Sequence, residues 1–193
     1  RIAAMRARAA EVGADIEEAV SAVIRAVKEK GLSAVEAYSL KFDGKIPYEI
    51  PREELEAAYD RCADELIAAM ERAAANIRDY NEKLLVQSME WTSPDGGTVG
   101  RVVRGLTRVG LYVPGGTAAY PSSVLMNAVP AKVAGVEELI MVTPPTENLN
   151  DAVLAAAKIA GVDRVIAVGG AQAIAALTFG AGFIPKVDKL VGP

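Results

Sequence analysis

The sequence contains no histidine and only one cysteine among its 193 residues. Histidine is the most common general base and the most common metal ligand, so this segment lacks the usual side chain for both roles. The single Cys62 cannot form an internal disulfide, which favours a reducing compartment. Cys62 is spaced with Leu55, Tyr59 and Leu66 as on one face of a helix, and we expect a small core residue rather than a nucleophile.

An excess of basic residues is also missing. The chain has 21 Lys and Arg against 25 Asp and Glu, a net charge of −4, and its basic residues alternate with acidic ones. Nucleic-acid surfaces need clustered Lys and Arg to neutralise phosphates, so we expect no nucleic-acid partner. With 51% apolar residues, the chain can instead bury the core of one or two globular domains.

Two long uncharged windows, 109–131 and 165–185, do not read as membrane spans. The first contains three Pro and three Gly, and the second divides at Gly169-Gly170 into a short apolar run and an Ala-rich helix. A buried strand followed by a covering helix explains both windows. The first residues have no apolar core typical of a signal peptide. We therefore expect a cytoplasmic protein without a membrane partner.

Helical patterns dominate before residue 100. Asp15 and Glu18 form a capping-box pattern for a helix that Gly31 ends, and Ser33 and Glu36 repeat the pattern for a second helix.

Pro51 follows a short extended run and opens an amphipathic stretch, read as two helices that meet near Asp64. Two short strands joined by a turn at 94–97 come next, and Trp91 in the first of them is predicted to be a packing residue.

After residue 105 a strand and a helix alternate. The predicted strands are 109–113, 139–143, 164–168 and 189–191, and the predicted helices lie near 122–134, 150–160 and 171–179. This alternation predicts βαβ units and a mostly parallel sheet flanked by helices. In such sheets, ligands bind at the carboxyl ends of the strands.

Three turns at these strand ends contain residues suited to a ligand site: Pro114-Gly115-Gly116, Pro144-Pro145 and Gly169-Gly170. Adjacent glycines let the backbone approach a bound group, and the free N–H groups of a following helix favour an anion, so a nucleotide suits the pattern. No dinucleotide or phosphate-loop motif is present, and turns of this kind can also serve only to reverse the chain.

Long stretches of the sequence resemble the histidinol dehydrogenase family. The segments are "VGLYVPGGTAAYPSSVLMNAVPAKVAGVEELIMVTPP", "GVDRVIAVGGAQAIAALTFG" and "IPKVDKLVGP", with weaker similarity in "AYSLKFDG" and "AAANIRDYNEK". The resemblance implies a fold related to aldehyde dehydrogenases, with incomplete Rossmann-like domains. Residues 1–104 would then be the helix-rich amino-terminal part of the first domain, and 105–193 a Rossmann-like nucleotide-binding domain truncated at its end.

The same resemblance implies an activity and its cofactors. Family members oxidise histidinol through the aldehyde to histidine, passing two hydrides to NAD, with a zinc ion holding the substrate in a homodimer. Family members are more than twice as long, and the chain lacks an initiator Met. We expect it to be roughly the amino-terminal half, with the zinc ligands and the acid/base pair in the other half. No catalytic or metal residue is therefore assigned here, and this half alone is expected to be inactive.

Two residues match family positions that contact NAD: Tyr112 in "GLYVPGG" and Gln172 in "GGAQA". Each follows or ends a predicted strand beside a glycine turn, and we expect the two to face each other across the strand ends. Tyr112 could alternatively be a core tyrosine, and Gln172 could simply cap its helix. Ser122 and Ser123 are interpreted as helix caps, because no base is present to activate them.

Two further hypotheses remain open. One is a sister NAD-dependent dehydrogenase that acts on another small alcohol. The other is a non-catalytic nucleotide-binding module formed by these residues alone.

Overall fold

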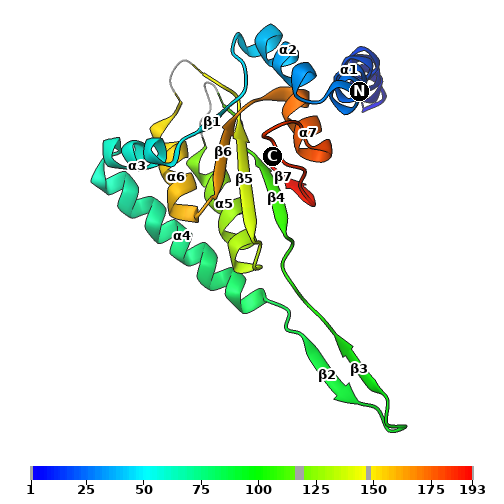
Figure 1. The fold of residues 1–193 in the computed structure, drawn as a ribbon, viewed down its shortest axis with the longest axis vertical. Coiled ribbons are helices and arrows are strands. Elements are labelled where there is room, and N and C mark those ends of the chain that lie inside the picture. The colour runs from blue at the N-terminus through cyan, green and yellow to red at the C-terminus, as the bar shows by residue number, and fades with distance from the viewer. Residues whose placement is uncertain (1, 116–119, 147–148, 193) are drawn as a thin grey trace.

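A five-stranded sheet covered by helices on both faces forms the body of the molecule, and a two-stranded hairpin projects from it (Figure 1). The computed structural model describes residues 2–115, 120–146 and 149–192, with side chains from residue 15 onward. The helices are α1 (Ile2–Lys30), α2 (Leu32–Asp43), α3 (Arg52–Arg61), α4 (Asp64–Leu84), α5 (Pro121–Val133), α6 (Asp151–Ala160) and α7 (Gly170–Phe179). The strands are β1 (Tyr48–Ile50), β2 (Met89–Thr92), β3 (Thr98–Arg101), β4 (Arg108–Tyr112), β5 (Glu138–Thr143), β6 (Arg164–Ala167) and β7 (Lys189–Val191).

The sheet has the strand order β1-β6-β5-β4-β7. Strands β4 to β7 are parallel, and β1 pairs with β6 in the antiparallel direction. The four predicted strands after residue 105 and the three helices between them are confirmed to within about two residues, the ordinary uncertainty of element ends. The α/β fold class is therefore confirmed, with the parallel arrangement that places strand ends at one edge.

Side chains of the central strand β5 alternate between two buried cores. Leu139 and Met141 join the core formed with α3, α4, α5 and α6, whereas Ile140 and Val142 join the core formed with α1, α2 and α7. All four are fully buried, as expected for a strand covered on both faces. The helix-rich first part of the chain thus contributes to both cores, α1 and α2 to one and α3 and α4 to the other.

Both capping-box predictions are wrong. Helix α1 begins at Ile2, so Asp15 lies in its interior, which the Ala-rich sequence before it favours. The Oγ of Ser33 donates to the carbonyl of Lys30 at 3.0 Å, and Gly31, with φ of 60°, separates α1 from α2. The two-helix prediction around Asp64 is confirmed by α3 and α4.

The caps predicted at Ser122 and Ser123 are also wrong. Helix α5 begins at Pro121, and Tyr120 occupies the N-cap position without a side-chain cap bond. Proline is favoured at the first helical position because its missing N–H would be unpaired there. The two serines therefore lie inside the first turn.

The hairpin of β2 and β3 extends away from the body (Figure 1). In its register Met89 pairs with Arg101 and Trp91 with Val99, so these four side chains share one face. Trp91 is 50% exposed, which contradicts its predicted packing role, because the hairpin stands clear of both cores. Within the described part of the chain, no helix is long and apolar enough to cross a membrane.

Candidate functional site

The three turns predicted to form a ligand site meet at the carboxyl edge of the sheet. A Cβ added to Gly115 would lie 3.2 Å from Cδ of Pro144, and one added to Gly169 would lie 2.7 Å from its Cγ. Pro144 therefore packs against both glycines, and a side chain at Gly169 would collide with it. The glycines permit this close approach of backbone. Gly116 lies outside the described residues.

Tyr112 ends β4 and lies half-buried against the core of α1, α2 and α7. The backbone N–H of Gly170, at the start of α7, donates to its hydroxyl at 3.4 Å. Gly170 has a φ of 63°, a left-handed conformation that glycine adopts without strain. Because the Tyr112 hydroxyl accepts this bond, its own proton remains available to donate to a ligand.

A cavity of about 410 Å³ opens beside Tyr112. Its lining consists of Tyr112, Gly170, Ile174, Leu190, Val191 and Gly192, from β4, β7 and α7. A Cβ at Gly192 would lie 2.8 Å from the Tyr112 carbonyl oxygen, so a small residue is required there. An apolar slot with one phenol and the N-terminus of a helix suits a planar ring that carries polar groups.

Gln172 lies at the same edge, but its side chain does not line this cavity. It is 1% exposed, and its Nε2 donates to Oδ2 of Asp43 at 3.4 Å. The structure therefore brings Tyr112 and Gln172 to the same turn, through Gly170, while it directs the Gln172 amide toward α2.

Asp43 at the end of α2 is a site neighbour that sequence reasoning did not identify. Burial raises the pKa of its carboxyl above the ordinary value. The only sequence signal at this position was the Asp43-Gly44 helix end, and Gly44 does end the helix in the left-handed conformation. Two residues later, Nζ of Lys45 donates to the Thr146 carbonyl at 2.7 Å, in the turn after β5.

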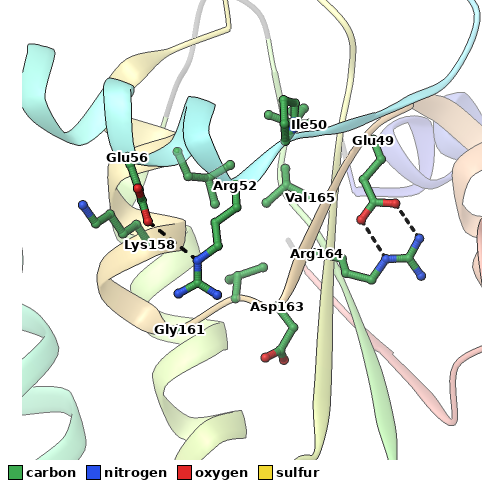
Figure 2. A pocket seen from close by; sticks show the side chains of 12 residues that line it. Glu49, Ile50, Arg52, Glu56, Lys158, Gly161, Asp163, Arg164 and Val165 are labelled. Carbon is green, nitrogen blue, oxygen red and sulfur yellow. Dashed lines mark hydrogen bonds and ion pairs between the residues drawn. The ribbon is translucent and has the colours of Figure 1, made fainter.

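A second cavity, of about 490 Å³, lies at the opposite, amino end of β6 (Figure 2). Its charged groups are largely paired with one another. Arg164 donates from Nε and Nη2 to the two carboxylate oxygens of Glu49 at 2.8 and 2.6 Å. Arg52 lies 3.8 Å from Glu56. The bidentate pair of Arg164 and Glu49 indicates that this cavity is an ion-paired surface beside the edge strand β1, rather than a ligand site.

Acid pH should weaken the contribution of Glu49 to stability. The hydrogen bond from Arg164 holds the pKa of Glu49 below its ordinary value of 4.5. A lowered folded-state pKa stabilises the fold above the unfolded-state pKa, and this stabilisation is lost as pH falls below about 4.5. We expect Glu49→Gln to lower the free energy of unfolding at pH 7 by at most about 1 kcal/mol, because the pair is partly exposed.

Urea denaturation at pH 7 and pH 3 measures this effect, and the difference between wild type and variant should shrink at pH 3. Glu56→Gln is the matched control, because Glu56 is more exposed and makes a longer ion pair. An equal loss at both pH values would contradict the role of the Glu49 charge.

The residues that the structure describes contain no group of three or more His, Cys, Asp or Glu side chains placed to hold one ion. This part of the chain therefore does not fit the zinc ion that the resemblance implies. Cys62 is half-buried against the core of α3 to α6, and burial raises the pKa of its thiol, which disfavours the reactive thiolate.

Comparisons with known proteins agree with one another. The family model for histidinol dehydrogenase matches residues 6–193. The histidinol dehydrogenase of Clostridium acetobutylicum is 50% identical over 194 residues, which cover 98% of this chain and 45% of that protein. That of Hydrogenovibrio crunogenus is 52% identical, with 92% of this chain and 42% of that protein covered.

A solved structure extends the match to three dimensions. The crystal structure of histidinol dehydrogenase from Elizabethkingia anophelis has a TM-score of 0.85 and 34% sequence identity, and covers 92% of this chain and 42% of that one. The chain thus spans somewhat less than half the length of the relatives it matches. Since the family model covers nearly every residue and relatives at about 50% identity match almost the whole chain, the chain belongs to the histidinol dehydrogenase family.

Proposed function

We propose that this chain forms the NAD-binding part of an enzyme that oxidises histidinol to histidine through the aldehyde. The observation that carries the proposal is the cavity between β4, β7 and α7, at the carboxyl edge where nucleotides bind in open α/β sheets. Membership of the family supports the substrate and the reaction class. Because the chain spans less than half of its relatives, the activity is proposed for the protein of which this segment is part.

The cavity residues would bind and orient the dinucleotide. The Tyr112 ring can pack against a ring of the cofactor while its hydroxyl donates a hydrogen bond. The N–H groups at the start of α7 favour a negatively charged group, and Gly192 keeps the slot open. When bound, NAD accepts the hydride, and the role of these residues is to hold it in place.

We propose further that the larger protein is cytoplasmic, and that its remaining half supplies the zinc ligands and the acid/base pair. No catalytic side chain is assigned within this segment, so its contribution is nucleotide binding and positioning. The family resemblance also suggests a homodimer. In support of dimer formation, Met89, Trp91 and Val99 lie exposed on one face of the hairpin, beside Arg101, and neither core of this chain covers them.

Turnover distinguishes the proposal from its alternatives. The full-length protein should form NADH from NAD when histidinol is added, and the 193-residue chain alone should not. NADH formation is followed by absorbance, after zinc supplementation. NAD binding without histidinol oxidation in the full-length protein would favour a sister dehydrogenase or a binding module, whereas turnover by the 193-residue chain would place the catalytic groups here.

A further inference from the structure

Asp43 is connected to the cavity beside Tyr112 by a continuous series of contacts. Its Oδ2 accepts from the buried Gln172 amide at 3.4 Å. The Gln172 side chain packs closely on Gly170, since a Cβ added to Gly170 would lie only 2.7 Å from Oε1 of Gln172. The N–H of Gly170 in turn donates to the Tyr112 hydroxyl. The series therefore leads from the end of α2 to the wall of the cavity.

The surroundings make Asp43 the group that holds the Gln172 amide. Gln172 is almost completely buried, and its Nε2 hydrogen bond to Asp43 spans 129 positions in sequence. A buried amide donor without a partner is costly, so loss of the Asp43 carboxylate would drive Gln172 to another conformation. Such a change acts directly on Gly170, because the two residues are in contact.

A second contact from the same segment holds the neighbouring turn. Lys45 donates to the Thr146 carbonyl at 2.7 Å, after β5. The segment 43–45 thus contacts the first turn of α7 and the turn after β5, although it lies in the helix-rich first part of the chain. The turn after β5 also packs against Gly169 through Pro144, so both contacts act on the same assembly of turns.

We propose that Asp43 is a positioning residue of the nucleotide site, which holds the Gln172 amide and thereby fixes the first turn of α7 against Tyr112. This inference rests on the proposed function for the nature of the ligand, and on the contacts alone for the positioning. Asp43 does not line the cavity, so its effect on a ligand is indirect.

Asp43→Ala and Asp43→Asn in the full-length protein separate positioning from a general structural role. The Asn side chain retains an oxygen that can accept from Gln172, whereas Ala cannot. We expect Asp43→Ala to raise the dissociation constant for NAD about tenfold, the effect of one weakened hydrogen-bonded contact, and Asp43→Asn to remain within about threefold of wild type. The KM for NAD should rise while the KM for histidinol stays unchanged.

Amide hydrogen exchange provides a readout that needs no ligand. Exchange at residues 170–173 should be faster in Asp43→Ala than in wild type, and restored in Asp43→Asn. Asp60→Ala, at an exposed carboxylate on α3, is the matched control and should change neither measurement. Thermal unfolding of each variant confirms that it is folded at the assay temperature.

The two readouts have separate consequences. Unchanged exchange at residues 170–173 in a folded Asp43→Ala protein would overturn the positioning role, as would Asp43→Asn behaving like Asp43→Ala. If the wild-type protein binds no NAD but exchange still depends on residue 43, the positioning role stands and the proposed nucleotide function is wrong.

Discussion

If the full-length protein forms the proposed homodimer through this hairpin, replacing Trp91 and Val99 together by threonine is expected to convert it to a monomer. The two residues face each other across the β2–β3 hairpin and, with Met89 and Arg101, form an exposed and mostly apolar face. Glu90, Thr92, Thr98 and Gly100 alternate with them, so the opposite face is polar. One apolar face on a projecting hairpin is typical of a docking element.

The expected effect is large, because truncation of a buried interface aromatic typically costs about 2 kcal/mol or more. Loss of the Trp91 ring alone should therefore raise the dimer dissociation constant about 30-fold or more. Threonine retains strand propensity, so the hairpin itself should persist.

Light scattering after size-exclusion chromatography, at about 10 μM where weakened interfaces dissociate, measures the change. Glu90→Gln, on the polar face, is the matched control and should leave the dimer intact. A double variant that remains dimeric would mean that another part of the same protein covers this face, or that the dimer uses a different surface.

The sheet could be predicted from sequence because each strand carries a local signal. Strands β4, β5 and β6 are short apolar runs that end at Pro or Gly, and the helices between them have periodic apolar faces. Helix starts were predicted less well. Asp15 and Glu18 fit the pattern of a helix N-terminus, but the Ala-rich residues before them favour a helix and extend α1 to Ile2. The local pattern does not show which of these two preferences prevails.

Exposure and long-range contacts could not be predicted in the same way. Trp91 is a large apolar residue of the kind that usually packs in a core. Only the direction in which the hairpin projects shows that it contacts neither core. The turn residues located the candidate site, because parallel strands place their carboxyl ends at one edge. The contact between Asp43 and Gln172 joins residues 129 positions apart, and it depends on how α2 packs on α7.

The location of Gln172 changes what its substitution should do. If the Gln172 amide contacted NAD directly, as the family resemblance implies, Gln172→Ala would weaken NAD binding with little change in stability. In the structure the side chain is 1% exposed and donates to Asp43, so truncation should leave a cavity and an unpaired carboxylate. We therefore expect Gln172→Ala to reduce the free energy of unfolding as well as NAD affinity, each by about 1–3 kcal/mol.

Tyr112 should behave differently, because it lines the cavity directly and is only half-buried. We expect Tyr112→Ala to weaken NAD binding by about 2–3 kcal/mol, through loss of ring packing and of the hydroxyl contact. Tyr112→Phe keeps the ring, so it should cost about 1 kcal/mol, the usual net value of one hydrogen bond. If the hydroxyl dominates instead, the two variants should be equally impaired.

Titration calorimetry of NAD into the full-length protein, paired with urea denaturation, separates these contributions. Tyr80→Ala is the matched control, because Tyr80 is 64% exposed on α4, on the other side of the sheet from α7. Variants at Tyr112 and Gln172 that bind NAD as wild type but unfold more easily would assign both residues to the fold alone. Weaker binding by Tyr112→Ala at unchanged stability would tie the ring to the ligand, because a purely structural tyrosine could not alter affinity without altering the free energy of unfolding.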